Sequence, residues 1–166
     1  MNASATAQSQ AVNIAKCLVK IANENQEPIN VDENDTPVFE GITHLKLQKL
    51  VYFAQVVSVV LNKKPLFDEE IQAWKYGPVI ESVYQVFQAA GREPIPTDEN
   101  FNVDADTEKF LKEIWKAFGK YSASELVSLS HSKPWQKARD AGTTIDIGEI
   151  KAHYAPIFSV TKDGQA

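Results

Sequence analysis

The sequence predicts a mainly α protein, a compact single-domain helical bundle of about seven helices with at most one short β-hairpin. Two observations support this prediction. Apolar residues recur every three or four positions over most of the chain, which is the period of a helix with one buried face. The 166 residues, 43% hydrophobic and 10% aromatic, suffice for one buried core. We expect the domain to span 9–158, between a flexible N-terminal tail, 1–8, and a C-terminal tail, 159–166.

A first helix is predicted where apolar residues form one stripe: Ala11, Ile14, Ala15, Leu18, Ile21 and Ala22. Cys17 lies beside this stripe, where a thiol is more often a packing residue than a nucleophile. It is the only cysteine, so the chain has no internal disulfide framework.

An acidic loop, 24–41, is expected to follow the first helix. Its segment 24–40 carries six carboxylates and no Lys or Arg, and without it the chain would hold 17 basic and 16 acidic residues. Pro28 and Pro37 favour turns over helix or strand. We expect an exposed connection, which serves solvation alone or docks a basic partner.

The segment 43–64 is predicted to be the central helix. Its many valines are compatible with a strand, but Gln48, Gln55 and Asn62 lie seven residues apart and trace a narrow polar line along a helix. Thr43 is the expected N-cap. Because the helix is apolar on nearly every other side, we expect neighbouring helices to surround it.

The stretch AWKYGPVIESVYQVF, 73–87, places two large aromatic residues and a cation before a Gly-Pro pair. The residues that lead into Pro78 are expected to form a short hairpin or an extended corner, because a residue before proline avoids the α conformation. Pro78 is expected at the first position of the next helix, where its missing N–H costs nothing. Gly91 is expected to end that helix in the left-handed conformation.

A further helix is predicted to end at Gly119, with one apolar face made of Phe110, Leu111, Ile114, Trp115 and Phe118. Ser122 and Glu125 then have the spacing of a capping box, in which each side chain bonds the other residue's backbone N–H. We expect Leu126 and Leu129 of this next helix to face inward.

The last two helices are predicted from their ends. Pro134 opens a short helix that closes near Gly142. Asp146 and Glu149 repeat the capping-box spacing before the final helix.

Catalytic and metal-binding functions are not expected. His44, His131 and His153 are scattered and lack the spacing of metal ligands, so we expect no metal site and no cofactor. Ser130 is adjacent to His131, but adjacent residues on a helix do not face each other, as a nucleophile and its base must. The protein is therefore not expected to be an enzyme.

The sequence disfavours three other classes of protein, namely secreted, membrane-spanning and nucleic-acid-binding proteins. The first ten residues have no apolar signal segment, and the longest apolar run, 12 residues, is shorter than the roughly 20 needed to span a bilayer. We expect a cytoplasmic location without membrane association. The net charge of -5 repels nucleic acid at long range.

A DNA-binding regulator of its own operon is the alternative function. The segment 122–142 has the outline of a helix-turn-helix, with Gln136, Lys137 and Arg139 on the second helix. Trp135 and Ala138 supply little apolar surface for docking such a helix. The cations are also few for phosphate binding.

Three segments of the chain carry a family resemblance: KLQKLVYFAQ, PLFDEEIQAWKYGPVIESVYQVF and YSASELVSLSHSKPWQKAR. Together they resemble the Panacea domain, the family of SocA-like antitoxins that is also seen in phage-associated GepA proteins. The resemblance covers about residues 8–155. It implies a non-enzymatic antitoxin that binds a toxin protein, encoded in a two-gene module often carried on a prophage or mobile element. The toxin would be masked directly or delivered to a ClpXP protease, and the sequence does not distinguish these mechanisms.

The partner is expected to bind at the Gly-Pro corner and the later Pro-Trp pair. Exposed aromatic and cationic side chains on a rigid turn lose little entropy on binding and often dominate interfaces. The alternative is that Trp74 and Tyr76 fill the core, and that Trp135 does so too. The candidate partner-binding residues are Trp74, Lys75, Tyr76, Gly77, Pro78, His131, Trp135, Lys137 and Arg139.

Overall fold

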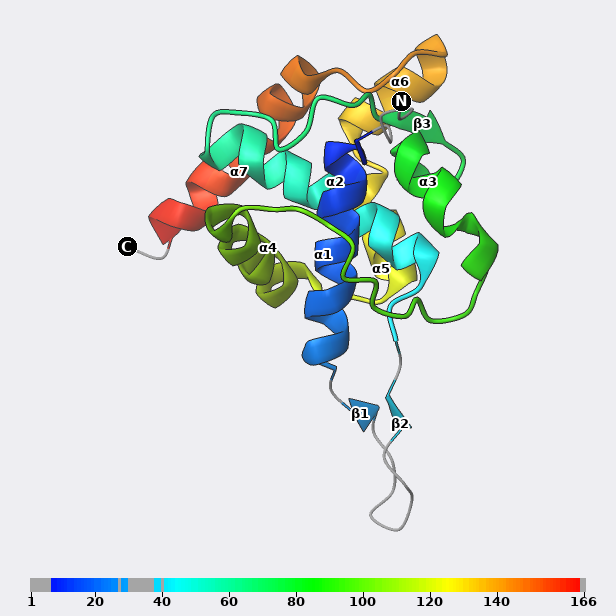
Figure 1. Ribbon diagram of the computed structural model, residues 1–166. Coiled ribbons are helices and arrows are strands. Elements are labelled where there is room, and N and C mark those ends of the chain that lie inside the picture. The colour runs from blue at the N-terminus through cyan, green and yellow to red at the C-terminus, as the bar shows by residue number, and fades with distance from the viewer. Residues whose placement is uncertain (1–6, 27, 30–37, 40, 165–166) are drawn as a thin grey trace, which may run out of the picture.

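Helix α2, His44–Leu61, is the centre of the fold in a computed structural model that describes residues 7–26, 28–29, 38–39 and 41–164. Five other α-helices pack directly against it (Figure 1). They are α1 (Gln10–Glu24), α3 (Glu81–Phe87), α4 (Ala105–Phe118), α5 (Ala123–Ser130) and α7 (Ile147–Gly164). The seven α-helices of the described residues confirm the mainly α fold class, and the central position of α2 is as predicted.

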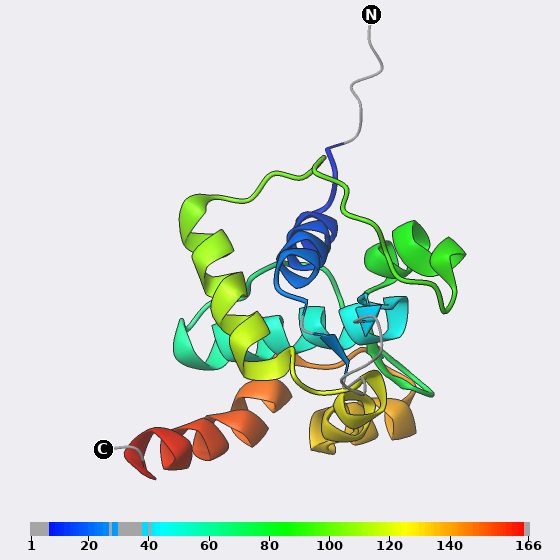
Figure 2. The same cartoon turned by 90° about the horizontal axis from the view of Figure 1, so that it is seen from below.

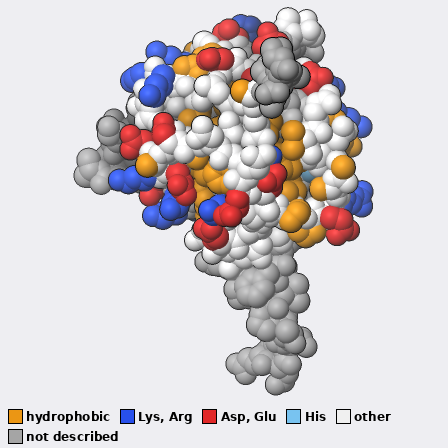
Figure 3. All heavy atoms as spheres, in the orientation of Figure 1, with side chains coloured by type: hydrophobic (Ala, Val, Ile, Leu, Met, Phe, Trp, Pro, Cys, Tyr) orange, Lys and Arg blue, Asp and Glu red, His pale blue; other side chains and the backbone are white. Residues whose placement is uncertain are grey.

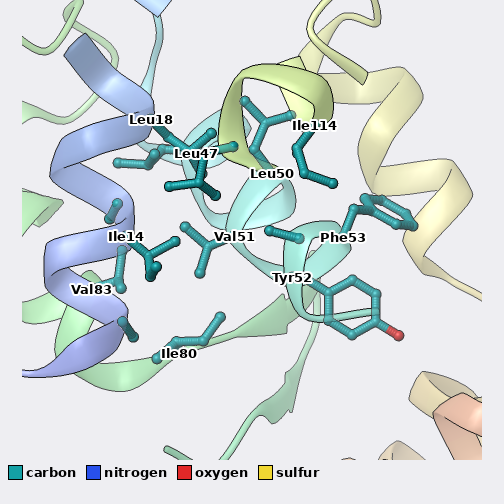
Figure 4. Packing of buried hydrophobic residues seen from close by; sticks show 14 of the residues in the cluster. Ile14, Leu18, Leu47, Leu50, Val51, Tyr52, Phe53, Ile80, Val83 and Ile114 are labelled. Carbon is teal, nitrogen blue, oxygen red and sulfur yellow. The ribbon is translucent and has the colours of Figure 1, made fainter. Parts of the chain in front are cut away.

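The core forms where α1 and α2 meet their neighbours (Figure 4). Side chains from α1, α2, α4 and the segment leading into α3 interdigitate there and are almost fully buried. The labelled residues of this cluster are Ile14, Leu18, Leu47, Leu50, Val51, Tyr52, Phe53, Ile80, Val83 and Ile114. The core thus surrounds α2 on several sides, which explains why that helix is apolar almost all round.

Two members of the predicted polar line, Gln48 and Gln55, are buried and bond to backbone groups, whereas the third, Asn62, is exposed at the C-cap of α2. The Gln48 amide donates to the Ile80 carbonyl at 3.1 Å and accepts from the Ile80 N–H at 3.0 Å. The Gln55 amide likewise donates to the Phe67 carbonyl at 2.8 Å and accepts from the Leu66 N–H at 2.6 Å. These glutamines therefore hold the chain that runs alongside α2, which satisfies their own buried polar groups.

Two short strand pairs join the helices. Strand β3, Gln72–Trp74, pairs antiparallel with β4, Gly77–Val79, and forms the hairpin that the sequence allowed. A second pair, β1 (Pro28–Ile29) with β2 (Val38–Phe39), was not predicted. It lies within the expected acidic loop, 24–41, most of which falls outside the described residues.

The predicted position of Pro78 at the start of a helix is wrong. Pro78 lies in β4, and the next helix, α3, begins three residues later and spans Glu81–Phe87. Strand pairing and a hydrogen bond to the Pro78 carbonyl keep the chain extended there. A short 3-10 helix, η1 (Gln88–Ala90), follows α3 and stops at Gly91 as predicted. The predicted left-handed α conformation is wrong there, because Gly91 has φ +57° and ψ -118°.

Most predicted helix ends are confirmed. Ser122 and Glu125 form the complete capping box of α5. Helix α6, Lys133–Ala141, ends at Gly142 in the left-handed conformation. The prediction for Leu129 is wrong, because α5 buries Leu126 and Ser130 on one face and leaves Leu129 47% exposed.

The chain ends differ in how far they are described. Residues 1–6 of the expected N-terminal tail lie outside the described residues, whereas the Gln8 amide donates to the Asn100 carbonyl at 3.0 Å. Helix α7 runs to Gly164, into the segment 159–166 that the sequence analysis assigns to a tail. Among the described residues, no helix is long and apolar enough to span a membrane.

Candidate partner-binding surface

The turn between β3 and β4 exposes a cation and an aromatic ring. Lys75 and Tyr76 form the tip, and the Tyr76 side chain is 62% exposed. The Lys75 ammonium lies 5.4 Å from the centre of the Tyr76 ring, within the range of a cation–π interaction. Gly77 and Pro78, directly behind the tip, are buried. The alternative hypothesis that Tyr76 fills the core is therefore wrong. Tyr76 is exposed to solvent, whereas the residues directly behind it are buried.

The buried base of the turn contains a lysine. Lys49 of α2 is 0% exposed, and its ammonium donates to the Pro78 carbonyl at 2.9 Å. Burial lowers the pKa of this lysine to about 8. The ammonium charge is costly in this position, and the Pro78 carbonyl compensates part of that cost.

Gly77 is required in this arrangement for two reasons. Its φ is +110°, which side chains other than glycine rarely adopt. A Cβ atom there would lie 2.7 Å from the Ser130 hydroxyl and 2.8 Å from Lys49 Cε. The turn can therefore lie directly on α2 and α5 only because residue 77 has no side chain.

A hydrogen bond joins Trp74 and Trp135, although the two residues are 61 positions apart in the sequence. The Trp135 indole N–H of α6 donates to the Trp74 carbonyl of β3 at 2.8 Å. The Trp74 ring packs edge-on against Tyr84 at 4.9 Å between ring centres, and its own N–H donates to the Gln72 side chain at 2.7 Å. Both tryptophans are half-buried, so each one supports the corner and keeps part of its ring accessible.

His131 and Arg139 flank the Trp135 ring. The His131 ring stacks on it with centres 4.0 Å apart and planes 9° apart. The Arg139 guanidinium lies 5.9 Å from the ring centre. Burial, and then the charges of Lys49 and Arg139, lower the pKa of His131, so its imidazole is neutral near pH 7.

The structure brings all but one of the predicted site residues together. The exception is Lys137, which forms an ion pair with Glu149 of α7 at 2.5 Å. We use the name corner surface for the accessible members of the group, which are Trp74, Lys75, Tyr76, His131, Trp135 and Arg139.

Two residues that support the corner from inside, Lys49 and Tyr84, were not predicted from the sequence. A lysine within the most apolar helix of the chain was the one available signal for Lys49. Tyr84 lies within the stretch 73–87 that the sequence singles out, but nothing local shows that it contacts Trp74.

The described part of the chain gives no support for metal binding by the histidines or for a reactive thiol at Cys17. No group of three or more His, Cys, Asp or Glu side chains is arranged there to hold a metal ion. Cys17 is buried in the core, and burial raises its pKa to about 11, which disfavours the reactive thiolate.

The sequence of this chain places it in a family of antitoxin-like proteins. The family described as "Antitoxin SocA-like, Panacea domain" matches residues 47–136, more than half of the chain, and the chain belongs to it. The matched segment runs from α2 into α6 and includes the β3–β4 turn and Trp135.

One curated relative is similar over a larger part of the chain. It is the protein named Antitoxin SocA from Caulobacter vibrioides (strain NA1000 / CB15N), which is 33% identical over 123 residues. That alignment covers 64% of this chain and 65% of the relative, slightly less than two thirds of the relative's length. No solved structure matches the chain.

Proposed function

We propose that this protein is an antitoxin that inactivates a toxin protein by binding it through the corner surface, without catalysing a reaction. The family membership and the name of the Caulobacter relative support the antitoxin role. The observation that supports the location is the fixed geometry of the turn, which exposes Tyr76 next to a buried base that the Lys49 ammonium bonds at the Pro78 carbonyl.

A prearranged surface of this composition is suited to binding protein. Aromatic residues and arginine contribute disproportionately to interface energies, about 2 kcal/mol or more at the strongest positions. Here the Trp135 ring is held by a hydrogen bond and by stacking on His131, and Lys75 lies over Tyr76. Fixed side chains lose little conformational entropy when a partner binds.

The helix-turn-helix alternative receives less support from the same residues. The second helix of such a motif must present its polar side chains to DNA. In α6, the Gln136 amide donates to the His131 carbonyl at 3.0 Å, and Lys137 is paired with Glu149. On the face that Figure 3 shows, acidic and basic side chains are interspersed and form no continuous basic surface.

Two mechanisms fit an antitoxin that binds through this surface. The protein either covers the active surface of the toxin or presents the bound toxin to a protease such as ClpXP. Direct masking is the simpler proposal, because a tight complex alone inactivates the toxin. Rescue from the toxin in cells that lack ClpXP would favour masking, and loss of rescue there would favour delivery.

Co-expression with neighbouring genes tests the function. Each open reading frame adjacent to this gene is induced in a heterologous host, alone and together with this protein. We expect one of them to arrest growth alone and to be neutralised by co-expression. The proposal is wrong if no neighbour is toxic, or if this protein never restores growth.

A further inference from the structure

A second candidate surface is a groove at the opposite end of α5 from the corner. It has a volume of about 730 Å³ and lies between the C-terminal ends of α1 and α4 and the N-terminal ends of α2 and α5. Figure 2 looks toward this end of the molecule, with α4 and α5 near the end of α1. Ala123 lines the groove, whereas Ser130 lies under the corner, about 10 Å away along the helix. The groove is thus distinct from the corner surface.

The charged residues that line the groove are mostly lysines, and two of its lining residues are aromatic. Lys46, Lys116 and Lys120 line it, whereas Glu125 is the one acidic side chain among its described lining residues. The aromatic lining residues are Trp115 and Tyr121. This local excess of positive charge contrasts with the net charge of -5 on the whole chain.

Lys46 is held in place at the groove. Its ammonium donates to the Gly119 carbonyl at 2.7 Å and lies 5.2 Å from the centre of the Trp115 ring. A Cβ atom at residue 119 would lie 2.6 Å from the Trp115 ring, so that ring can pack against residue 119 because this residue is a glycine. The lysine head group is therefore oriented before any ligand arrives.

The other two lysines are accessible to a ligand. Lys116 pairs with Glu113 at 3.1 Å, but both side chains are exposed, and exposed pairs are weak. The Lys120 ammonium lies 5.4 Å from the Tyr121 ring centre. Carboxylates of a ligand that enters the groove would thus meet two accessible ammonium groups close to aromatic rings.

We propose that this groove binds a short acidic peptide segment of a partner protein. The volume is within the range of sites that enclose a ligand. Charge complementarity selects carboxylates, and the aromatic walls suit the apolar side chains between them. A nucleic acid is less favoured, because its long phosphate backbone would also meet the negative charge of the remaining surface.

The experiment uses the full-length, isotope-labelled protein and NMR titration. The probe is a synthetic peptide of alternating Asp and Ala residues with one Phe, and the matched peptide has Asn in place of Asp. We expect the Asp peptide to shift the backbone signals of Gly119 and Tyr121 and the indole signal of Trp115. We expect the Asn peptide to bind at least about tenfold more weakly, because two exposed charge pairs together contribute roughly 1.4 kcal/mol.

Two double variants with equal changes in charge locate the binding. Lys116→Glu with Lys120→Glu reverses charge in the groove, whereas Lys109→Glu with Lys112→Glu does so on α4 outside it. We expect the first pair to weaken binding roughly tenfold and the second pair by less than about twofold. All four lysines are exposed, so both variants should fold, which circular dichroism checks.

Several results would overturn the proposal. Equal binding of the Asp and Asn peptides, equal effects of the two variants, or no shift at Trp115 would show that the groove does not select acidic peptides. Stronger binding of oligothymidylate at the same residues would assign the groove to nucleic acid. Concentration-dependent shifts without any peptide would assign it to a second copy of this chain.

Discussion

The ammonium of Lys49 donates a hydrogen bond to the carbonyl of Pro78 across 2.9 Å, and no part of that lysine is accessible to solvent. This bond joins the central helix α2 to the turn that exposes Tyr76. The turn therefore shares the rigidity of the core, although its tip lies at the surface.

The pH dependence of stability should report the burial of Lys49. Burial lowers its pKa to about 8 in the folded protein, whereas the ordinary value is 10.5. Between these pH values the unfolded chain binds more protons, so this lysine makes the free energy of unfolding rise with pH. Relative to Lys49→Met, the wild type should gain up to about 3 kcal/mol from pH 7.5 to pH 10.5.

Urea denaturation of both proteins at several pH values measures this difference. Other groups that titrate in the same range are present in both proteins, so their contributions cancel. A constant difference across the range would show that Lys49 is not buried as a destabilised cation.

Substitution of Gly77 should be far more damaging than substitution of a comparable glycine. Gly77→Ala adds a Cβ atom at φ +110° and within 2.8 Å of both Lys49 and Ser130, so we expect a loss of about 3 kcal/mol. Gly142→Ala is the control, since its φ is +67° and nothing lies within 4 Å. It should cost about 1 kcal/mol. Equal losses in thermal denaturation would contradict the close packing under the turn.

Trp135→Phe should loosen the corner while the core remains intact. The variant keeps an aromatic ring for His131 to stack on but removes the N–H that donates to the Trp74 carbonyl. We expect the free energy of unfolding to fall by about 1 kcal/mol. Hydrogen exchange at Lys75 and Tyr76 should accelerate at the same time. Unchanged exchange at the turn would mean that this hydrogen bond does not restrain it.

Lys137 and Arg139 should differ in their effect on toxin binding. Arg139→Ala removes the guanidinium that lies over Trp135, so the proposed interface predicts weaker binding. Lys137→Ala breaks only the ion pair with Glu149, and the affinity should stay within about twofold. Isothermal titration calorimetry with the purified toxin compares them. A larger effect of Lys137→Ala would place the interface on the other side of α6.

Local signals in the sequence predicted much of the fold. The capping box of Ser122 and Glu125 and the left-handed Gly142 are confirmed, because each depends on residues within a few positions. Pro78 shows the limit of such signals. Proline suits the first turn of a helix and also an edge strand, and only the tertiary contact with Lys49 distinguishes them here.

The candidate site was predicted in composition but not in geometry. The residue types around the Gly-Pro pair indicated an exposed aromatic corner, and Tyr76 is indeed exposed. The bond between Trp135 and Trp74 and the burial of Lys49 depend on how distant segments pack. Lysine is almost never fully buried, so sequence reasoning places it at the surface by default.

The affinity of the Tyr76→Ala variant for the toxin identified by co-expression tests the central proposal most directly. Because the side chain is 62% exposed, we expect the free energy of unfolding to change by less than about 0.5 kcal/mol. The dissociation constant should rise roughly thirtyfold, as loss of a 2 kcal/mol interface residue requires. An unchanged dissociation constant with unchanged stability would contradict binding through the corner surface.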